Sequence, residues 1–313
     1  MVKFILGGGI AGLLCAFYLK DYTIISDNLG GQNSEDFSLG PRLIKVDEYT
    51  TKLLKDLNIQ AEKVIYKIGY KEDKKIYSSI PQGFKEKYVQ HTRELDNTEN
   101  SHLSSGESSV ECYDFDYQKL VKTLIDKTKT YVIGKVKNIE YDKITFIDSF
   151  FALNYNKLIS TLPLPLFYKI SDQEHKVKDF DTFDTTFVLI ESEKQDDISM
   201  SELYNYIYIV DEPFHRKTFL KREYKNKIQY ILEYKGVLTA TELTKIFMNF
   251  YYDVELIHDV KQIKVIPRCQ IKQSKNILQD NITGTRFLGR YAQWNHQIKI
   301  NELLKEIHER LNG

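Results

Sequence analysis

Three glycines near the start of the chain have the spacing of a loop that binds phosphate groups. They are Gly7, Gly9 and Gly12, within the segment GGGIAG at 7–12. In a G-x-G-x-x-G loop the first glycine makes a tight turn, and the second lets the backbone approach a pyrophosphate. The third lets a helix pack closely against a strand. The spacing therefore predicts a loop for a dinucleotide.

The residues around the loop follow the order strand, turn, helix, strand. Residues 2–6 are a short apolar run, residues 10–18 carry apolar side chains at helical spacing, and residues 22–25 are rich in β-branched side chains. This order predicts a βαβ unit whose parallel strands are buried. Ile10 and Ala11 would then offer backbone N–H groups at a helix N-terminus, where an anion is favoured.

An acidic residue that binds the ribose is expected at the end of the second strand, about 20 residues after the loop. Ser26 and Asp27 share that place. Asp27 is the preferred candidate because a carboxylate accepts hydrogen bonds from ribose hydroxyls, but Ser26 stays open as the alternative.

Composition excludes several other classes of protein. The 313 residues can form one large domain or two smaller ones, and 44 basic residues balance 44 acidic ones. Such a chain has no net field to attract nucleic acid or an anionic membrane. Cys15, Cys112 and Cys269 form neither a disulfide framework nor a zinc site, which favours a reducing, cytoplasmic setting. No metal-binding cluster, Ser-His-Asp order or Walker lysine is recognisable.

The apolar stretch 4–19 follows Lys3, an arrangement that signal peptides also have. Glycines interrupt its apolar part and no small-x-small cleavage site follows, so we interpret it as part of the βαβ unit. It is also too short to span a bilayer, and a soluble protein without a membrane partner is expected.

The rest of the chain changes character near its middle. Helices are expected over 48–57, 117–127 and a C-terminal segment with Leu303 to Leu311, and a capping box at Thr239–Glu242. The polar segment 90–111 predicts a mobile loop, and a disordered surface insertion is the alternative. Four strands are expected without helices between them, which predicts an antiparallel sheet; their ranges are 183–190, 204–210, 216–222 and 228–234.

A second glycine pair, Gly30-Gly31-Gln32, follows the ribose position, and four further segments continue the pattern. These are LGPRLIKVDEYTTKLLKDL (39–57), GKVKNI (134–139), KLISTLPLP (157–165) and FLGRYAQWNHQIKINELLKEI (287–307). In this order the chain resembles the flavoproteins with two dinucleotide-binding motifs, the superfamily of FAD-dependent amine oxidases, protoporphyrinogen oxidase and UDP-galactopyranose mutase.

The resemblance implies that FAD is the cofactor. It implies that the backbone at Val136 clasps the adenine, and that Gly289 and Arg290 lie by the cofactor. Gln297 and Ile298 would present N–H groups to the flavin O2 edge, where negative charge develops on reduction. The full set of implied cofactor residues is Gly7, Gly9, Ile10, Ala11, Gly12, Ser26, Asp27, Gly31, Gln32, Gly40, Pro41, Arg42, Val136, Thr161, Gly289, Arg290, Gln297 and Ile298.

Two reactions are compatible with the resemblance. In an oxidoreductase, an amine or a CH–CH or CH–NH donor on a small or nucleotide-linked metabolite gives hydride to flavin N5. In a mutase-like enzyme, the reduced flavin attacks a sugar carbon of a nucleotide sugar and no net redox occurs. A redox-inert flavin-binding scaffold is a third possibility.

Substrate-side candidates fall in the second half of the chain. Arg216, Arg222 and Arg268 could bind a diphosphate, because guanidinium suits that anion. His296 and His215 are candidates for proton transfer, and Tyr206 and Tyr208 could line a pocket. The chain departs from the amine oxidases, which often place a lysine by flavin N5 and have Gly-Glu near the C-terminus. It departs from the mutases because Trp294 is its only tryptophan.

We therefore expect an α/β protein with a Rossmann-like FAD-binding domain and a substrate domain built on an antiparallel sheet plus helices. The FAD-binding domain is predicted at 1–60, 112–165 and 262–313, and the substrate domain at 61–111 and 166–261. A small-molecule substrate is expected, and the sequence does not indicate an oligomeric state.

Overall fold

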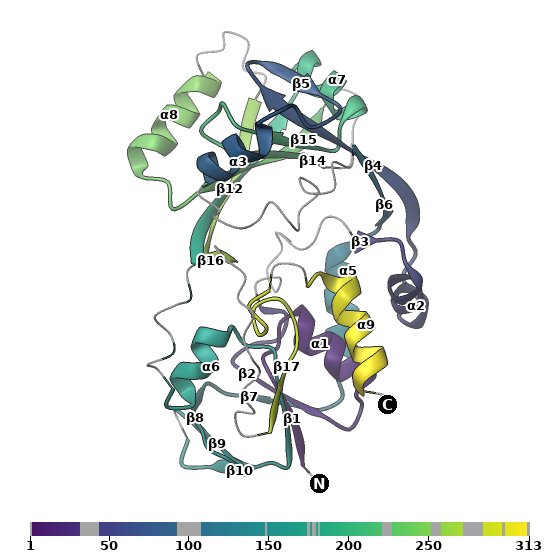
Figure 1. Cartoon of the computed structure of the whole chain (residues 1–313), viewed down its shortest axis with the longest axis vertical. Coiled ribbons are helices and arrows are strands. Elements are labelled where there is room, and N and C mark those ends of the chain that lie inside the picture. Colours follow the sequence, from purple (N-terminus) through teal and green to yellow (C-terminus); the bar gives the residue numbers. More distant parts are fainter. Residues whose placement is uncertain are drawn as a thin grey trace. The chain divides into compact units, whose positions relative to one another are not determined.

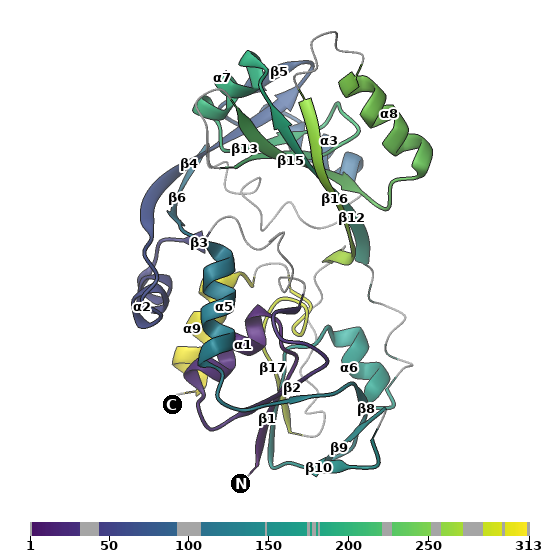
Figure 2. The same ribbon diagram turned by 180° about the vertical axis from the view of Figure 1, so that it is seen from behind.

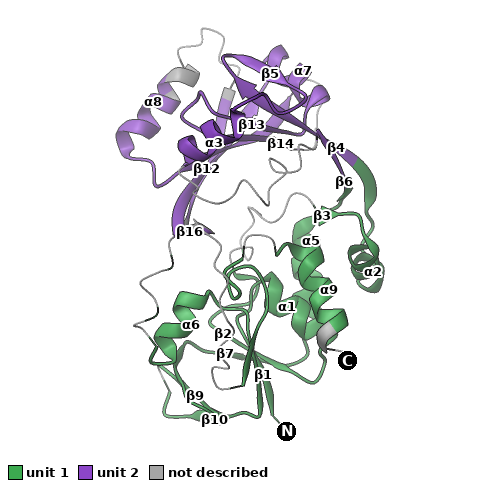
Figure 3. Ribbon diagram, viewed as in Figure 1, with its two compact units in different colours: residues 1–64, 112–180, 274–313 green, residues 65–111, 181–273 purple. Residues whose placement is uncertain are grey.

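A computed structural model describes residues 2–31, 44–92, 108–147, 149–173, 176, 180, 182–220, 227–251, 258–271, 284–295 and 298–311. The chain divides into two compact units (Figure 3). Unit 1 consists of Met1–Val64, Cys112–Phe180 and Ser274–Gly313. Unit 2 consists of Ile65–Glu111 and Asp181–Gln273.

Unit 1 is built on a five-stranded sheet in which each pair of neighbouring strands is parallel. Its order is β17 (Thr285–Phe287), β11 (Lys157–Ser160), β1 (Lys3–Leu6), β2 (Thr23–Ser26) and β7 (Tyr131–Ile133). The predicted βαβ unit is confirmed, because α1 (Ile10–Tyr18) connects β1 to β2. A smaller antiparallel sheet follows, of β10 (Ala152–Asn154), β9 (Lys143–Phe146) and β8 (Val136–Ile139).

Helices pack on the parallel sheet and on one another, and together they form the core of unit 1. α1 packs against α5 (Tyr117–Lys127) and α9 (Ile300–Leu311), and α9 packs against α2 (Glu48–Asp56), as Figures 1 and 2 show. The core between them contains Leu13, Leu14, Leu120, Leu124 and Leu304. α6 (Leu164–Ile170) follows β11.

A nine-stranded mixed sheet contains the strands of unit 2. Its order is β16 (His258–Ile271), β12 (Thr182–Ser192), β15 (Ile228–Lys235), β14 (Arg216–Phe219), β13 (Tyr206–Ile209), β4 (Glu62–Glu72), β6 (Ser109–Asp114) and β3 (Ile44–Lys45), and β5 (Lys75–Tyr77) pairs with β4. From β16 to β13 the neighbouring strands are antiparallel, as predicted, but β13 is parallel to β4. The predicted α/β class, with a parallel sheet and a second, mainly antiparallel sheet, is confirmed.

Three helices of unit 2 refine the sequence prediction. α7 (Gln195–Leu203) lies between β12 and β13, so the expected run of strands without helices is wrong there. α3 (Phe84–Thr92) includes residues 90–92 of the predicted mobile loop, and β6 includes 109–111; residues 93–107 lie outside the described residues. α8 (Ala240–Tyr251) begins at the predicted capping box, where Thr239 N–H donates to Glu242 Oε2 at 2.7 Å.

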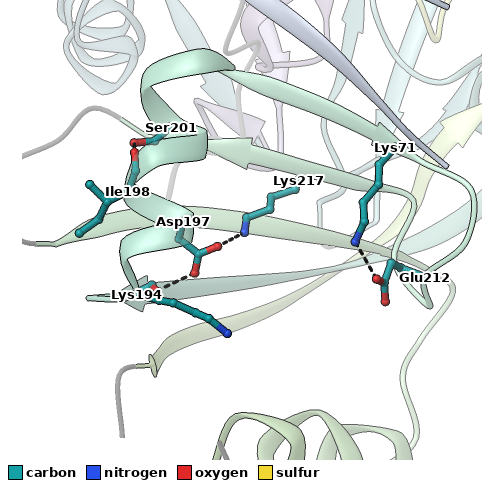
Figure 4. A network of polar contacts seen from close by, with 8 residues as sticks. Lys71, Lys194, Asp197, Ile198, Ser201, Glu212 and Lys217 are labelled. Carbon is teal, nitrogen blue, oxygen red and sulfur yellow. Dashed lines mark hydrogen bonds and ion pairs between the residues drawn. The ribbon is translucent and has the colours of Figure 1, made fainter. Parts of the chain in front are cut away.

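A buried ion pair ties α7 to the sheet (Figure 4). Lys217 Nζ lies 2.5 Å from Asp197 Oδ1, and only 11% and 7% of the two side chains are exposed. Ser192 Oγ donates to the other carboxylate oxygen at 2.7 Å. The ammonium also lies 3.8 Å from the centroid of the Tyr230 ring, a cation–π distance. Burial lowers the pKa of Lys217, which shows how strongly its charge depends on these partners.

Substitution Asp197→Ala is expected to destabilise the protein by about 3–5 kcal/mol, because it leaves the Lys217 charge buried without its carboxylate. The matched control is Glu212→Ala, which removes a more exposed ion pair with Lys71 and should cost less than about 1 kcal/mol. Urea unfolding of both variants measures the difference. Equal losses for the two variants would contradict the assignment of Asp197 as a buried counter-ion.

Candidate functional site

The first glycine of the loop occupies a position that only glycine adopts easily. Gly7 has a φ of +101°, in the left-handed region. Its N–H donates to the carbonyl oxygen of Ile25 at 2.9 Å, so the turn is joined to β2 directly after β1. A Cβ atom on Gly7 would lie 2.7 Å from Thr161 Oγ1, which itself donates to Leu6 O at 2.8 Å. Thr161, an implied cofactor residue, is thus hydrogen-bonded to the last residue of β1 and lies beside Gly7.

The third glycine lets α1 lie directly against the turn. A Cβ atom on Gly12 would lie 1.9 Å from the carbonyl oxygen of Gly7, a separation that no side chain tolerates. The close packing of helix on strand that the motif requires is therefore present.

The second glycine is different, because nothing lies within 4 Å of the place where its Cβ atom would be. Gly9 is also the N-cap residue of α1, where no side chain caps the helix and the first turn carries no acidic residue. The backbone at Gly9 is thus open to an approaching group at the positive end of a helix. Such a place suits a phosphate.

Ser26 and Asp27 have different surroundings at the end of β2. Ser26 is buried, and its Oγ accepts a hydrogen bond from Gly8 N–H at 2.9 Å. Asp27 follows directly and is exposed. The serine hydroxyl therefore supports the glycine loop, whereas the carboxylate remains accessible to a ligand.

The second glycine pair packs against the first loop. Gly30 N–H donates to Gly8 O at 2.8 Å. Gly31 has a φ of +57°, and a Cβ atom on it would lie 3.1 Å from Gly9 Cα. Both glycine motifs thus meet around one piece of backbone.

Two later segments also reach this region. Gly134 N–H donates to Ser26 O at 2.8 Å, which brings the segment leading to Val136 beside the end of β2. Gly289, with a φ of +94°, lies against α1, since a Cβ atom on it would be 3.0 Å from Ala11 Cβ. The structure therefore brings together those described segments that carry Gly7 to Gly12, Ser26, Gly31, Thr161 and Gly289, and it places them at the carboxyl ends of the parallel strands β1, β2, β11 and β17.

In the turn after Gly289, Arg290 and Ile298, which were expected to face a ligand, form hydrogen bonds within the chain. Arg290 Nε donates to Ile298 O at 3.3 Å, and Ile298 N–H donates to Asn295 O at 3.3 Å. The Ile298 N–H, implied as a donor to the flavin, is thus used within the turn. At the start of α9, Lys299 N–H donates to Glu302 Oε2 at 2.9 Å.

In unit 2 the structure brings together four predicted residues: Tyr206, Tyr208, His215 and Arg216. The Tyr206 and Tyr208 rings lie 4.8 Å apart, and the Arg216 guanidinium lies 5.2 Å from the Tyr206 ring centroid. The guanidinium pairs with Glu233, whose side chain is fully buried. A compensated charge is poorly suited to hold a diphosphate, so this pairing weakens the interpretation of Arg216 as a substrate-binding residue.

His215 is buried and its Nδ1 has no hydrogen-bond partner. Burial lowers the pKa of His215 to about 3. The ring is therefore neutral near pH 7 and a poor proton acceptor, which weakens the interpretation of His215 as a catalytic base.

Other predicted residues lie outside the described residues: Gln32, Gly40, Pro41, Arg42, Arg222, His296 and Gln297. Arg268 belongs to β16, but its side chain is not described. Among the described residues no group of His, Cys, Asp and Glu could hold a metal ion. Within the same part of the chain, every helix is too short or too polar to cross a membrane.

Sequence reasoning missed Glu233 and Tyr88. Tyr88, on α3, contacts both Tyr208 and His215, with ring centroids 5.2 and 6.2 Å apart. A signal for Glu233 exists, since it is the only acidic residue in the apolar strand IQYILEYK, and such a residue needs a buried partner. Tyr88 has no comparable signal.

Comparison with known proteins supports the fold. The chain is similar to the crystal structure of reduced UDP-galactopyranose mutase, with a TM-score of 0.73 and 12% identity over 99% of this chain and 95% of that one. It is similar to cyclohexylamine oxidase from Brevibacterium oxydans IH-35A (TM-score 0.65, 9% identity, 100% and 99% covered). It is also similar to a fatty acid isomerase from P. acnes (TM-score 0.62, 12% identity, 99% and 97% covered).

The sequence matches no protein-family model and no curated protein. The structural likenesses extend over essentially the whole chain, so the chain has the fold of this group of enzymes. The expected resemblance to amine oxidases and UDP-galactopyranose mutase is confirmed at the level of the fold. The three proteins are named after different reactions, so the fold does not determine the chemistry.

The buried His215 ring should make stability depend on pH. Between its folded pKa of about 3 and the ordinary value of 6.5, the unfolded chain binds a proton there that the folded chain does not. Stability therefore rises with pH across this window, and His215 contributes a loss of about 1.4 kcal/mol per pH unit below 6.5.

The variant His215→Phe should flatten the dependence of the unfolding free energy on pH between about pH 4 and 6.5, measured by urea denaturation. His308→Phe serves for comparison: burial lowers the pKa of this ring too, but the ring is only partly buried, so a smaller flattening is expected. An unchanged slope in His215→Phe would show that His215 binds as many protons in the folded protein as in the unfolded chain over this range.

Proposed function

We propose that unit 1 binds FAD and that the protein is a flavin-dependent oxidoreductase. The observation that carries this proposal is the contrast among the three loop glycines. At Gly7 and Gly12, neighbouring atoms occupy the place where a Cβ atom would be. At Gly9 that place is open, and it lies at an uncapped helix N-terminus. This is the arrangement that a pyrophosphate needs.

The neighbouring residues fit the remaining parts of the cofactor. Ile10 and Ala11 would donate backbone N–H groups to the phosphates, and the exposed carboxylate of Asp27 would accept hydrogen bonds from the ribose. Val136 would lie by the adenine. Gly289 would let the chain pass close to α1 and the cofactor.

Bound FAD would supply a hydride acceptor, and the chain would supply orientation and exclusion of water. The donor is proposed to be a small or nucleotide-linked metabolite with an amine, CH–CH or CH–NH group. Pairing of Arg216 with Glu233 supports this choice, because a compensated charge is poorly suited to hold a diphosphate.

A mutase-like, non-redox reaction on a nucleotide sugar is the second candidate. The similarity to reduced UDP-galactopyranose mutase, with a TM-score of 0.73, favours it. It requires a cation for the diphosphate, for which Arg222 and Arg268 remain the candidates.

The absorbance spectrum of the purified protein, with identification of the released cofactor, tests FAD binding. A flavin band that is due to FAD is expected. Bleaching of this band under anaerobic conditions by an amine supports the oxidoreductase. Conversion of a nucleotide sugar only after dithionite reduction supports the mutase-like reaction, and a colourless protein that cannot take up FAD refutes both.

Substitution Gly9→Ala should weaken FAD binding by at least about tenfold, because a methyl group would occupy the place of the pyrophosphate, while stability stays unchanged. Gly12→Ala should instead destabilise the fold by about 3 kcal/mol, because its methyl group would overlap the Gly7 carbonyl. Fluorescence titration with FAD and thermal unfolding separate the two effects. If Gly9→Ala binds FAD as tightly as the unsubstituted protein, the loop does not hold the pyrophosphate.

A further inference from the structure

A buried tryptophan occupies a strained backbone position between β17 and α9, in the segment 289–295, here called the β17–α9 turn. Trp294 has a φ of +49°, in the left-handed region, and only 1% of its surface is exposed. Residues with a side chain are disfavoured in this region and keep such a conformation only where the surrounding contacts impose it. Strain of this kind is often found at functional sites, so its cause at Trp294 matters.

Other residues with a positive φ have different surroundings. Among the described residues other than glycine they are Asn58, Asp73, Lys74 and Asp172. All four are polar and exposed, as is usual in surface turns. Trp294 is the only one of the five that is buried. Its conformation is therefore explained by the contacts of its ring and not by a local turn preference.

The indole ring connects the β17–α9 turn to α6 through a second aromatic side chain. Its centroid lies 4.9 Å from that of Phe180, in an edge-to-face arrangement. Phe180 in turn contacts Tyr168 of α6, with ring centroids 5.7 Å apart. Leu164 N–H, at the first residue of α6, donates to Tyr291 O at 3.0 Å. Aromatic packing and a backbone hydrogen bond thus hold the turn to α6.

The same turn contacts the helix that follows the phosphate loop. Gly289 lies against Ala11, in the first turn of α1 and two residues after the open backbone at Gly9. Gln293 Nε2 donates to Glu306 Oε2 of α9 at 2.7 Å. A displacement of the turn would therefore move Gly289 relative to Ala11, whose N–H is proposed to bind a phosphate.

We propose that Trp294 is a positioning residue for the cofactor: its buried ring holds the β17–α9 turn so that Gly289 stays beside Ala11 at the FAD site. The inference rests on the proposed function, because it requires FAD as the ligand. Since the ring is buried, it acts through the turn and not by contact with FAD. A turn that is held in place before FAD arrives need not be ordered when FAD binds, which strengthens binding.

Substitution Trp294→Leu keeps an apolar side chain but removes the ring. It should weaken FAD binding by at least about tenfold, because the turn must then be ordered on binding. Trp294→Phe keeps a ring against Phe180 and should bind FAD within about threefold of the unsubstituted protein. Fluorescence titration with FAD measures both affinities, and thermal unfolding without FAD measures the stability of each variant.

Tyr155→Leu is the matched control for lost stability. Tyr155 is also a buried aromatic residue of unit 1, 6% exposed, and its hydroxyl donates to Glu140 O at 2.8 Å. It lies near the amino end of β1, because Asn156 N–H donates to Val2 O. Tyr155→Leu should lower the Tm of the FAD-free protein but leave its affinity for FAD unchanged. An equal loss of affinity in Tyr155→Leu and Trp294→Leu would overturn the proposal.

A second pair of variants tests the turn without altering the ring, and it decides the question if Trp294→Leu does not fold. Gln293→Ala removes the hydrogen bond to Glu306 and should weaken FAD binding by about fivefold. Gln229→Ala removes a hydrogen bond of the same type in unit 2, from Gln229 Nε2 to Glu191 Oε2 at 3.3 Å. It should leave the affinity unchanged, and the same affinity in both variants would contradict the proposal.

The fluorescence of Trp294 separates this inference from the proposed function. Trp294 is the only tryptophan of the chain, so its emission reports on the β17–α9 turn. Added FAD should quench this emission in the unsubstituted protein, by energy transfer to the flavin. A protein that shows neither quenching nor FAD binding refutes the proposed function and this inference together. Quenching and tight binding in the unsubstituted protein, with equally tight binding by Trp294→Leu, retain the proposed function and overturn the inference alone.

Discussion

The contact between Gly12 and the carbonyl oxygen of Gly7 sets the geometry of unit 1. With no side chain at position 12, the first helical turn can lie on the turn that ends β1. That position brings Gly9 to the helix N-terminus, lets Gly31 pack against Gly9, and allows Gly289 to pass Ala11. Any larger residue at position 12 would push α1 away from the sheet and separate these segments.

Unit 2 is organised by a different constraint, the division of its sheet into two unlike faces. One face packs the hydrophobic cluster that includes Val188, Ile207 and Leu232, and the buried Lys217–Asp197 pair fixes where α7 lies on it. The other face also buries apolar side chains, Phe187 and Ile231 among them, and it carries the ion pair between Arg216 and Glu233.

Local patterns predicted much of unit 1 and less of unit 2. Glycine spacing and short apolar runs were sufficient to predict the βαβ unit, because its strand, turn, helix and second strand follow one another directly in the sequence. α7 was missed because QDDISMSEL has few apolar residues at helical spacing, and its position depends on the contact of Asp197 with Lys217. The pairing of Arg216 with Glu233 depends on the register between β14 and β15, which no local pattern specifies.

The parallel pairing of β13 with β4 has a consequence for the folding of the chain. β4 precedes the 112–180 part of unit 1, whereas β13 follows it, and Ile68 lies beside Tyr206 in the sheet. During synthesis β4 therefore cannot pair with β13 until residues 112–180 of unit 1 have been synthesised. β1 likewise cannot pair with β11 until that strand is synthesised, since Lys3 lies opposite Lys157 in the sheet. Contacts so distant in sequence slow folding, and neither unit can be cut out as a continuous fragment.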